Sequence, residues 1–354
     1  MRPLILLPLF VGSLCAQAIP VLSQAQIQQL ETTVAQNPAD RPSQTLLGQN
    51  YSFVILGITA LAQYNTVAGV DPAKARGEFA QHARDVMQTS SFAGVLGEGG
   101  QALWNFSFQV QGYEAQHPSE APVAYLDAAR ALGAQAVDRA IAIEPGTATW
   151  RSYRIPILAL RSNSDSLPIS AKDAYRQVKD DLSVLTGAMR YAVLATAAKL
   201  AVKGAALDDA QSYAIELLDS ATNPKDWNYG NAVFFGNMVQ GQVALRRGDP
   251  AAARSRLLAA GNTTGSPQLN SFGPNMSLAR DLLTGAGDVT GVGSASRESR
   301  VPRRYETSPE ARQAVLEFFD LCQVFWTMGR DRLQQWSQQV RAGVVPEFGA
   351  NLYY

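Results

Sequence analysis

The stretch that most constrains this chain runs from Asn228 to Gly261, where two helix-forming segments are separated by a very short turn. Apolar side chains recur every three or four residues in the first segment, and Gly248 can end a helix in the left-handed conformation. Asp249 suits the N-cap of a second helix, and Pro250 suits its first position because proline has no amide proton to lose there. The pattern predicts two antiparallel helices joined by a tight turn.

Small and apolar residues occupy the positions at which these two helices would touch. They are Gly241, Ala244, Gly248, Ala253, Leu257 and Ala260. On these residues the stretch resembles a tetratricopeptide repeat, in which small side chains let paired helices approach closely. Residues 208–221 resemble the second helix of a further, degenerate repeat. The resemblance implies an all-α fold, an α-solenoid in which antiparallel helical hairpins stack into a right-handed superhelix.

The C-terminal part of the chain, residues 205–354, resembles exported bacterial proteins that contain tetratricopeptide repeats. Three segments carry the likeness: Ser271–Met276, Phe318–Cys322 and Phe348–Leu352. This resemblance implies a helical-repeat fold and no particular reaction. We therefore expect an N-terminal helical region at residues 19–204 and a repeat-like helical region at residues 205–354.

The composition argues against several classes of protein. Lys and Arg total 30, and so do Asp and Glu, so no overall field would draw the chain to nucleic acid or to an anionic membrane. Aromatic residues make up only 8% of the chain, and alanine is abundant, which favours close-packed helices over strands.

Residues 1–18 are typical of a signal peptide, with an apolar run from Leu4 to Leu14 followed by Ala16-Gln17-Ala18. The run is too short to span a bilayer comfortably. We expect export, to the periplasm or the medium. Cys15 leaves lipidation open as an alternative, although a leucine precedes it where that processing prefers a small residue. After cleavage at this site Cys322 has no partner for an internal disulfide.

Helical periodicity recurs along most of the remaining chain. We expect helices at residues 23–35, 44–64, 71–89, 101–113, 119–143, 171–186, 188–202, 208–221, 274–283, 308–329 and 331–340. The glycine-dense stretch at 94–100 predicts a flexible loop or a close backbone approach. Residues 150–160 are ambiguous because Pro156 would interrupt a helix. Residues 285–307 have four arginines and no apolar period, so we expect a mobile insertion, either solvated or in contact with an anion.

The sequence lacks the motifs of common catalytic and metal sites. His82 and His117 are the only histidines, which leaves few ligands for a transition metal. No nucleophile elbow, zinc-protease motif or phosphate-binding loop is present. Neighbouring acids such as Asp180 and Asp181 would point about 100° apart on a helix and so would not converge on one bond. We predict no catalytic residue, no metal and no cofactor.

The resemblance to tetratricopeptide arrays also places a binding surface, because the face of the first helix that lacks the signature residues lines their inner groove. Here that face comprises Phe235, Met238, Gln242, Leu245 and Arg246. Phe235 and Met238 offer adaptable apolar contact, Gln242 can pair with a peptide backbone, and Arg246 can hold a carboxylate bidentately. The alternative is that these residues pack against the next hairpin.

The sequence therefore predicts an exported scaffold that binds a protein or peptide, without catalysis. The alternative function is an exported all-helical enzyme that cleaves glycans with a lone carboxylate, since such a residue leaves little trace in one sequence. The partner and the oligomeric state stay open.

Overall fold

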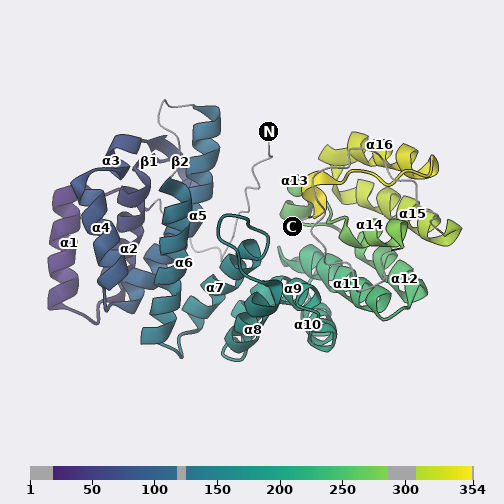
Figure 1. The fold of residues 1–354 in the computed structure, drawn as a ribbon, viewed down its shortest axis with the longest axis horizontal. Coiled ribbons are helices and arrows are strands. Elements are labelled where there is room, and N and C mark those ends of the chain that lie inside the picture. Colours follow the sequence, from purple (N-terminus) through teal and green to yellow (C-terminus); the bar gives the residue numbers. More distant parts are fainter. Residues whose placement is uncertain (1–18, 118–124, 286–307, 353–354) are drawn as a thin grey trace. The chain divides into compact units, whose positions relative to one another are not determined.

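The structure is a computed structural model that describes residues 19–117, 125–285 and 308–352 (Figure 1). These ranges form sixteen α-helices and one two-stranded sheet, so the predicted all-α fold class is confirmed. The predictions for the signal peptide, for the arginine-bearing insertion from residue 286 and for the helix start at residue 119 lie outside the described residues. Within the described ranges, no helix combines the length and the apolar character that a membrane crossing requires.

The chain divides into two compact units, each considered by itself. Unit 1 comprises residues 1–169 and 178–189, and unit 2 comprises residues 170–177 and 190–354. Helices α8 (Ala171–Leu182) and α9 (Gly187–Lys203) contribute residues to both units.

Unit 1 is built around a long central helix, α5, which packs most extensively on α2 and α6. Its other elements precede and follow α5 in the chain. The elements are α1 (Gln24–Gln36), α2 (Arg41–Leu56), β1 (Ile58–Leu61), β2 (Val67–Val70), α3 (Pro72–Ala75), α4 (Glu78–Thr89), α5 (Ala93–Gln116), α6 (Tyr125–Ile143) and α7 (Ala148–Arg161). The core of this unit includes Tyr51, Phe53, Leu103 and Val137.

The expected helix at 44–64 is too long. Gly57 adopts the left-handed conformation, with φ of 68°, and ends α2 there. Ile58 and Leu61, which continue the apolar period of the helix, lie instead in β1, which pairs antiparallel with β2. The expected single helix at 71–89 is interrupted as well, because α3 ends before Gly77 and α4 begins after it. Asp71 caps α3 as the sequence predicts.

The glycines at 94–100 do not form a loop, since all four lie inside α5 and are buried. The alternative expectation for this stretch, a close approach of the backbone to its neighbours, is the one that the structure shows. A Cβ added at Gly97 would overlap the ring of Trp150, and one at Gly100 would lie 2.6 Å from the carbonyl oxygen of Gly133 on α6. Helix α7 is continuous although Pro156 lies inside it.

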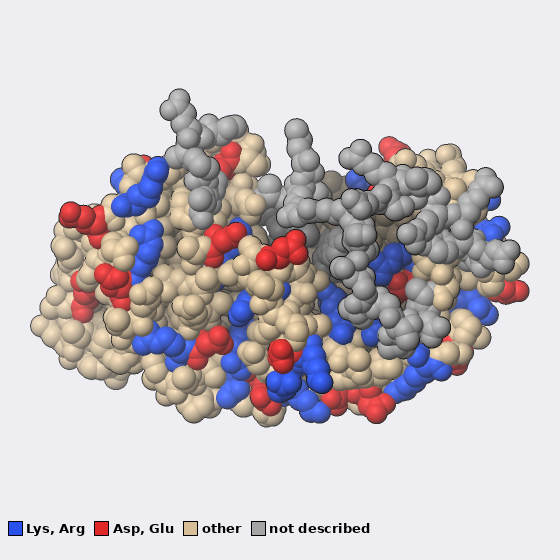
Figure 2. All heavy atoms as spheres, in the orientation of Figure 1, with Lys and Arg blue, Asp and Glu red and all other residues tan. Residues whose placement is uncertain are grey.

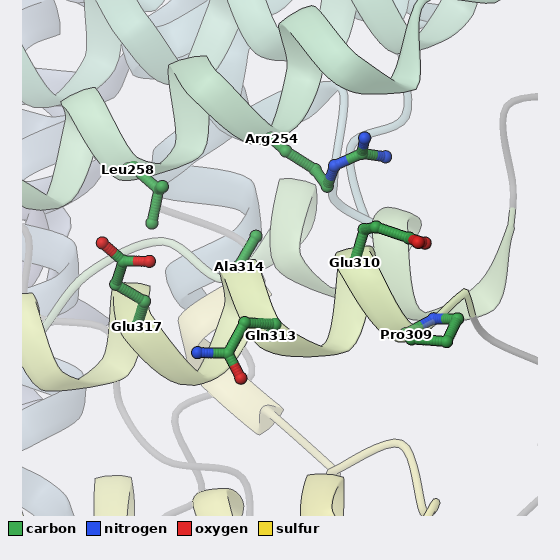
Figure 3. A pocket seen from close by; sticks show the side chains of 7 residues that line it. All are labelled: Arg254, Leu258, Pro309, Glu310, Gln313, Ala314 and Glu317. Atoms are coloured by element: carbon green, nitrogen blue, oxygen red, sulfur yellow. The ribbon is translucent and has the colours of Figure 1, made fainter.

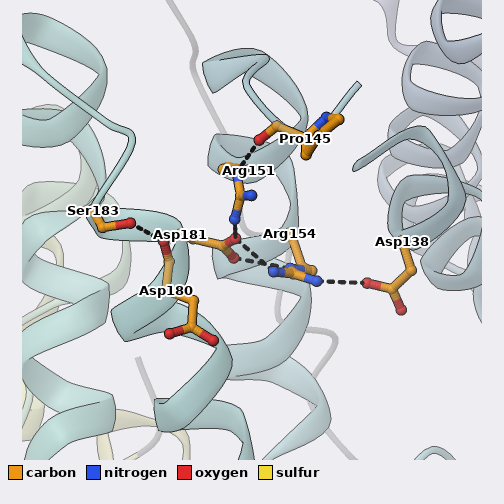
Figure 4. A network of polar contacts seen from close by, with 7 residues as sticks. All are labelled: Asp138, Pro145, Arg151, Arg154, Asp180, Asp181 and Ser183. Atoms are coloured by element: carbon orange, nitrogen blue, oxygen red, sulfur yellow. Dashed lines mark hydrogen bonds and ion pairs between the residues drawn. The ribbon is translucent and has the colours of Figure 1, made fainter. Parts of the chain in front are cut away.

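A buried ion cluster joins α6, α7 and the end of α8 within unit 1 (Figure 4). The Asp181 side chain is fully buried and accepts hydrogen bonds from Arg151 at 3.0 Å and from Arg154 at 2.6 and 2.9 Å. Arg154 also pairs with Asp138 at 3.2 Å. Burial raises the pKa of Asp181, although both guanidinium groups act in the opposite direction. The cluster therefore satisfies polar groups that would otherwise be costly to bury.

Unit 2 contains the predicted helical hairpin, formed by α11 and α12. Gly248 has φ of 79°, the Asp249 side chain caps α12, and Pro250 takes its first position, so this turn is confirmed in detail. The remaining helices follow in order. The elements are α10 (Leu207–Ser220), α11 (Tyr229–Arg246), α12 (Pro250–Gly261), α13 (Pro267–Phe272), α14 (Ser277–Thr284), α15 (Pro309–Phe325) and α16 (Arg330–Arg341).

Several helix ends in unit 2 differ from expectation by a turn or less. The helix expected at 308–329 ends at Phe325, and α13 was not predicted. Ser308 and Pro309 begin α15 as expected. Aromatic side chains from α11, α15 and α16 form the core of this unit, including Phe234, Phe318 and Trp336.

The last described residues close over this core. Phe348 is buried among the aromatic side chains. Asn351 donates hydrogen bonds to the carbonyl oxygens of Phe272 and Pro274, at 3.2 and 3.0 Å. The backbone carbonyl oxygen of Asn351 accepts a hydrogen bond from the backbone amide of Met276 at 2.7 Å. Asn351 thus fixes the turn between α13 and α14.

Candidate functional site

Helix α11 carries the predicted binding residues, and close contacts hold it on opposite sides. A Cβ added at Gly236 would lie 2.6 Å from Leu218 of α10. One added at Gly241 would lie 3.3 Å from the carbonyl oxygen of Ala253 on α12 and would overlap Leu278 of α14. Small residues are therefore required at these two positions, as the sequence predicts for Gly241.

The other predicted packing residues lie mostly in the interface of α11 and α12. Ala253, Leu257 and Ala260 are fully buried on α12, and Ala244 is partly buried on α11. Gly248 is exposed at the turn and serves through its positive φ rather than through packing.

The predicted binding residues are Phe235, Met238, Gln242, Leu245 and Arg246, here called the α11 face. Met238 and Leu245 are buried in the core of unit 2, at 3% and 7% exposure, so they present little surface to a partner. Phe235 is partly exposed and packs edge-on against Phe234 at 5.2 Å between ring centroids. The use of these residues in binding stays a prediction.

The two polar members of the α11 face are held by neighbouring helices of unit 2. The Gln242 amide donates a hydrogen bond to the Ser277 hydroxyl of α14 at 2.8 Å. The Arg246 guanidinium donates to the carbonyl oxygen of Val202 on α9. Burial lowers the pKa of Arg246, and Asp281 of α14 acts in the opposite direction. Within the described residues Arg246 makes no ion pair with a carboxylate.

Lys199 of α9 belongs to the same site, although the sequence reasoning missed it. Its ammonium nitrogen lies 4.2 Å from the centroid of the Phe235 ring. Burial lowers the pKa of Lys199 to about 8, and the like charge of Lys203 adds to this effect. The available signal was one lysine inside an apolar, alanine-rich run, but the run alone does not say which way the lysine faces.

The acid whose charge acts on Arg246 already has a cationic partner. Asp281 of α14 accepts from the Arg280 guanidinium at 2.7 Å. Burial raises the pKa of Asp281. Basic groups consequently outnumber acidic ones among the charged residues named around the α11 face. On the side of the molecule that Figure 2 shows, blue and red side chains are interspersed.

A shallow groove of about 450 Å³ also lies in unit 2, between α12 and α15 (Figure 3). Its walls combine both charges with apolar groups. The lining residues are Arg254, Leu258, Pro309, Glu310, Gln313, Ala314 and Glu317. The charged groups of this groove are one arginine and two glutamates.

The residues considered for chemistry lie apart from the α11 face in the chain. His82 contacts Glu31 at 2.8 Å, and His117 stacks on Tyr113. Cys322 is fully buried, and burial raises the pKa of its thiol well above the ordinary value. In the part of the chain that the structure describes, no three metal-binding side chains gather.

Glu98 of α5 is the carboxylate that bears on the alternative function, and the sequence reasoning did not single it out. It is partly buried in unit 1 and accepts a hydrogen bond from the Tyr153 hydroxyl at 3.2 Å. Burial raises the pKa of Glu98, which Tyr153 and Arg41 partly counteract. A raised pKa is what a carboxylic acid needs in order to donate a proton at neutral pH.

The fold and the α11 face together define an all-α protein with paired helices and a partly buried basic site. A scan against protein-family models finds no match, and searches of curated proteins and of solved structures find none either.

Proposed function

We propose that this protein is an exported scaffold that binds a protein or peptide through tetratricopeptide-like helical hairpins stacked into a solenoid. The observation that carries the proposal is the packing of α11. It contacts α10 of the preceding helix pair on one side and its own partner α12 on the other. This is the relation that stacked helical hairpins require.

Contacts between α9 and α11 support the same proposal. Lys199 of α9 contacts Phe235 of α11, and the Val202 carbonyl of α9 accepts a hydrogen bond from Arg246 at the end of α11. Side chains of α9, α10 and α11 also share one buried cluster, which includes Ala198, Ala214 and Val243. First helices of successive hairpins lie beside one another in this way. A further pair, α15 and α16, follows with α15 packed against α12.

The α11 face supplies the groups for binding. Gln242 and Arg246 now bond to Ser277 and to the Val202 carbonyl. A bound peptide would take over these donors, and Arg246 could then bind a carboxylate bidentately. The signal-like residues 1–18 support export.

Cross-linking in the native cell, followed by mass spectrometry, tests this function. The exchanges Arg246→Ala and Gln242→Ala should weaken capture of the partner. Arg247→Ala is the matched control, because Arg247 pairs with Asp208 on the exposed side of the hairpin. Equal capture by all three variants would contradict a binding role for the α11 face.

The second candidate function is glycan cleavage, which the environment of Glu98 favours. Purified protein should then release fragments from peptidoglycan or an oligosaccharide, and Glu98→Gln should abolish the release. Tyr153→Phe removes a hydrogen bond that lowers the pKa of Glu98, so it should shift the alkaline limb of the pH profile to higher pH. No fragment from the purified unmodified protein would exclude this candidate.

A further inference from the structure

Lys199 is a partly buried cation without a counter-ion. The described residues of the chain provide its ammonium with neither an ion pair nor a hydrogen-bond acceptor, and its contact is the face of Phe235. Other partly buried cations in the described ranges have an acceptor. Arg84 and Arg139, for example, donate to backbone carbonyl oxygens. Arg154 pairs with Asp181, and Arg190 pairs with Glu216. Lys199 is therefore an exception that needs a separate physical account.

The Phe235 ring stabilises the ammonium only in part. A cation over an aromatic face gains about 0.5 to 2 kcal/mol, less than desolvation takes from an unpaired charge. The charged groups around it are mainly of the same sign. Lys203 lies one turn along α9, and Arg246 reaches α9 from α11.

The one acid on the neighbouring helix does not serve as the missing counter-ion. Asp281 of α14 is bound by Arg280 at 2.7 Å, although its charge acts on Arg246. Two cations, Lys199 and Arg246, thus lie where α9 meets α11 without a carboxylate in contact. Acidic groups of a partner at this junction would compensate these charges.

We propose that Lys199 and Arg246 form an anion-binding site between α9 and α11, and that it takes Asp or Glu side chains of an acidic peptide. The inference rests on the proposed function and specifies the chemical class of its partner. A peptide fits better than a free anion because Gln242 and Ser277, further along the same face, offer an amide and a hydroxyl to a peptide backbone. Arg246 would bind a carboxylate of the peptide bidentately, and Lys199 would attract a carboxylate as a point charge.

Protonation of Lys199 should follow occupancy of the site. A carboxylate beside the ammonium favours the charged form, so binding should raise the pKa of Lys199 above its value of about 8 in the free protein. Binding above this pH should then take up a proton, and affinity should fall as the pH rises further.

The test is fluorescence anisotropy with the full chain and capped peptides of equal length, one rich in Asp and Glu and one with Asn and Gln in their places. The acidic peptide should bind about tenfold more tightly or better, because each charge-assisted pair contributes at least that much. Lys199→Met should remove about tenfold of that affinity and leave the amide peptide unchanged. Lys199→Arg should retain binding.

Controls separate the possible causes of failure. Lys225→Met removes an exposed lysine outside the site and should change nothing. Circular dichroism melting shows whether Lys199→Met folds; if it does not, the comparison of Lys199→Arg with Lys199→Gln takes its place. Equal binding of the two peptides would overturn the anion site while leaving peptide binding intact.

Two further outcomes also decide. If free glutamate competes as strongly as the acidic peptide, the site takes a small anion and the peptide assignment is wrong. If neither peptide binds, the anion site is overturned, and cross-linking in the cell still decides separately whether the protein has a partner.

Discussion

Lys199 makes the stability of unit 2 depend on pH in a defined direction. The pKa of Lys199 falls from its ordinary 10.5 to about 8 in the folded chain. Between these values the unfolded chain binds a proton that the folded chain does not, so stability should rise with pH from about 8 to 10.5.

Lys199→Met lacks this titration and provides the reference. We expect the free energy of unfolding of the unmodified protein to increase relative to the variant across this range, measured by urea denaturation at several pH values. A constant difference between the two proteins would mean that Lys199 titrates normally.

Asp181 and its neighbour Asp180 allow a matched comparison of a buried and an exposed acid. Asp181→Asn leaves Arg151 and Arg154 without their shared counter-ion, and we expect a loss of about 3 kcal/mol. Asp180 is exposed, so Asp180→Asn should change stability by less than about 0.5 kcal/mol. Chemical denaturation of both variants measures the difference, and similar losses would show that the cluster contributes no specific stability.

At the scale of elements, helix α5 depends on the absence of side chains at its glycines. Gly97→Ala forces a methyl group against the buried ring of Trp150, and we expect a loss of about 1 to 3 kcal/mol despite the better helix propensity of alanine. Gly146→Ala is the control, since nothing lies within 4 Å of a Cβ added there. Thermal unfolding compares them, and a stabilised Gly97→Ala would contradict the close approach.

The elements that sequence reasoning predicts well are those with local signals at both ends. The turn at Gly248–Pro250 has an end signal and a start signal, and the structure contains both. The helix expected to run to residue 64 failed because the apolar period continued through Gly57 into a strand. Composition could not show that the glycines of α5 face another helix, because contacts such as Gly100 with Gly133 and Gly97 with Trp150 join residues 33 and 53 positions apart.

The candidate site was predicted only in part for a similar reason. The α11 face follows from one helix and a resemblance, so its residues could be named. The depth to which Met238 and Leu245 are buried depends on other helices. Lys199 lies on α9 and contacts Phe235 of α11, and no pattern within the sequence of α9 indicates this contact.

At the scale of the molecule, Asn351 shows how distant residues complete unit 2. Asn351→Ala removes two hydrogen bonds, one to the buried carbonyl group of Pro274 and one to the partly buried carbonyl group of Phe272, and we expect a loss of about 2 kcal/mol. Glu347→Ala, at an exposed neighbour, should be close to neutral. Urea denaturation tests both, and equal stability of the two variants would show that the turn between α13 and α14 holds without Asn351.

The same contact sets an order of events during biosynthesis. Pro274 and Asn351 are 77 positions apart, so the turn leaves the ribosome well before the residue that fastens it. At a synthesis rate of about 5 to 20 residues per second, Asn351 is added roughly 4 to 15 s after Pro274. Unit 2 therefore passes through a stage in which α11 and α12 can already pair while the turn between α13 and α14 still lacks the side chain that fixes it.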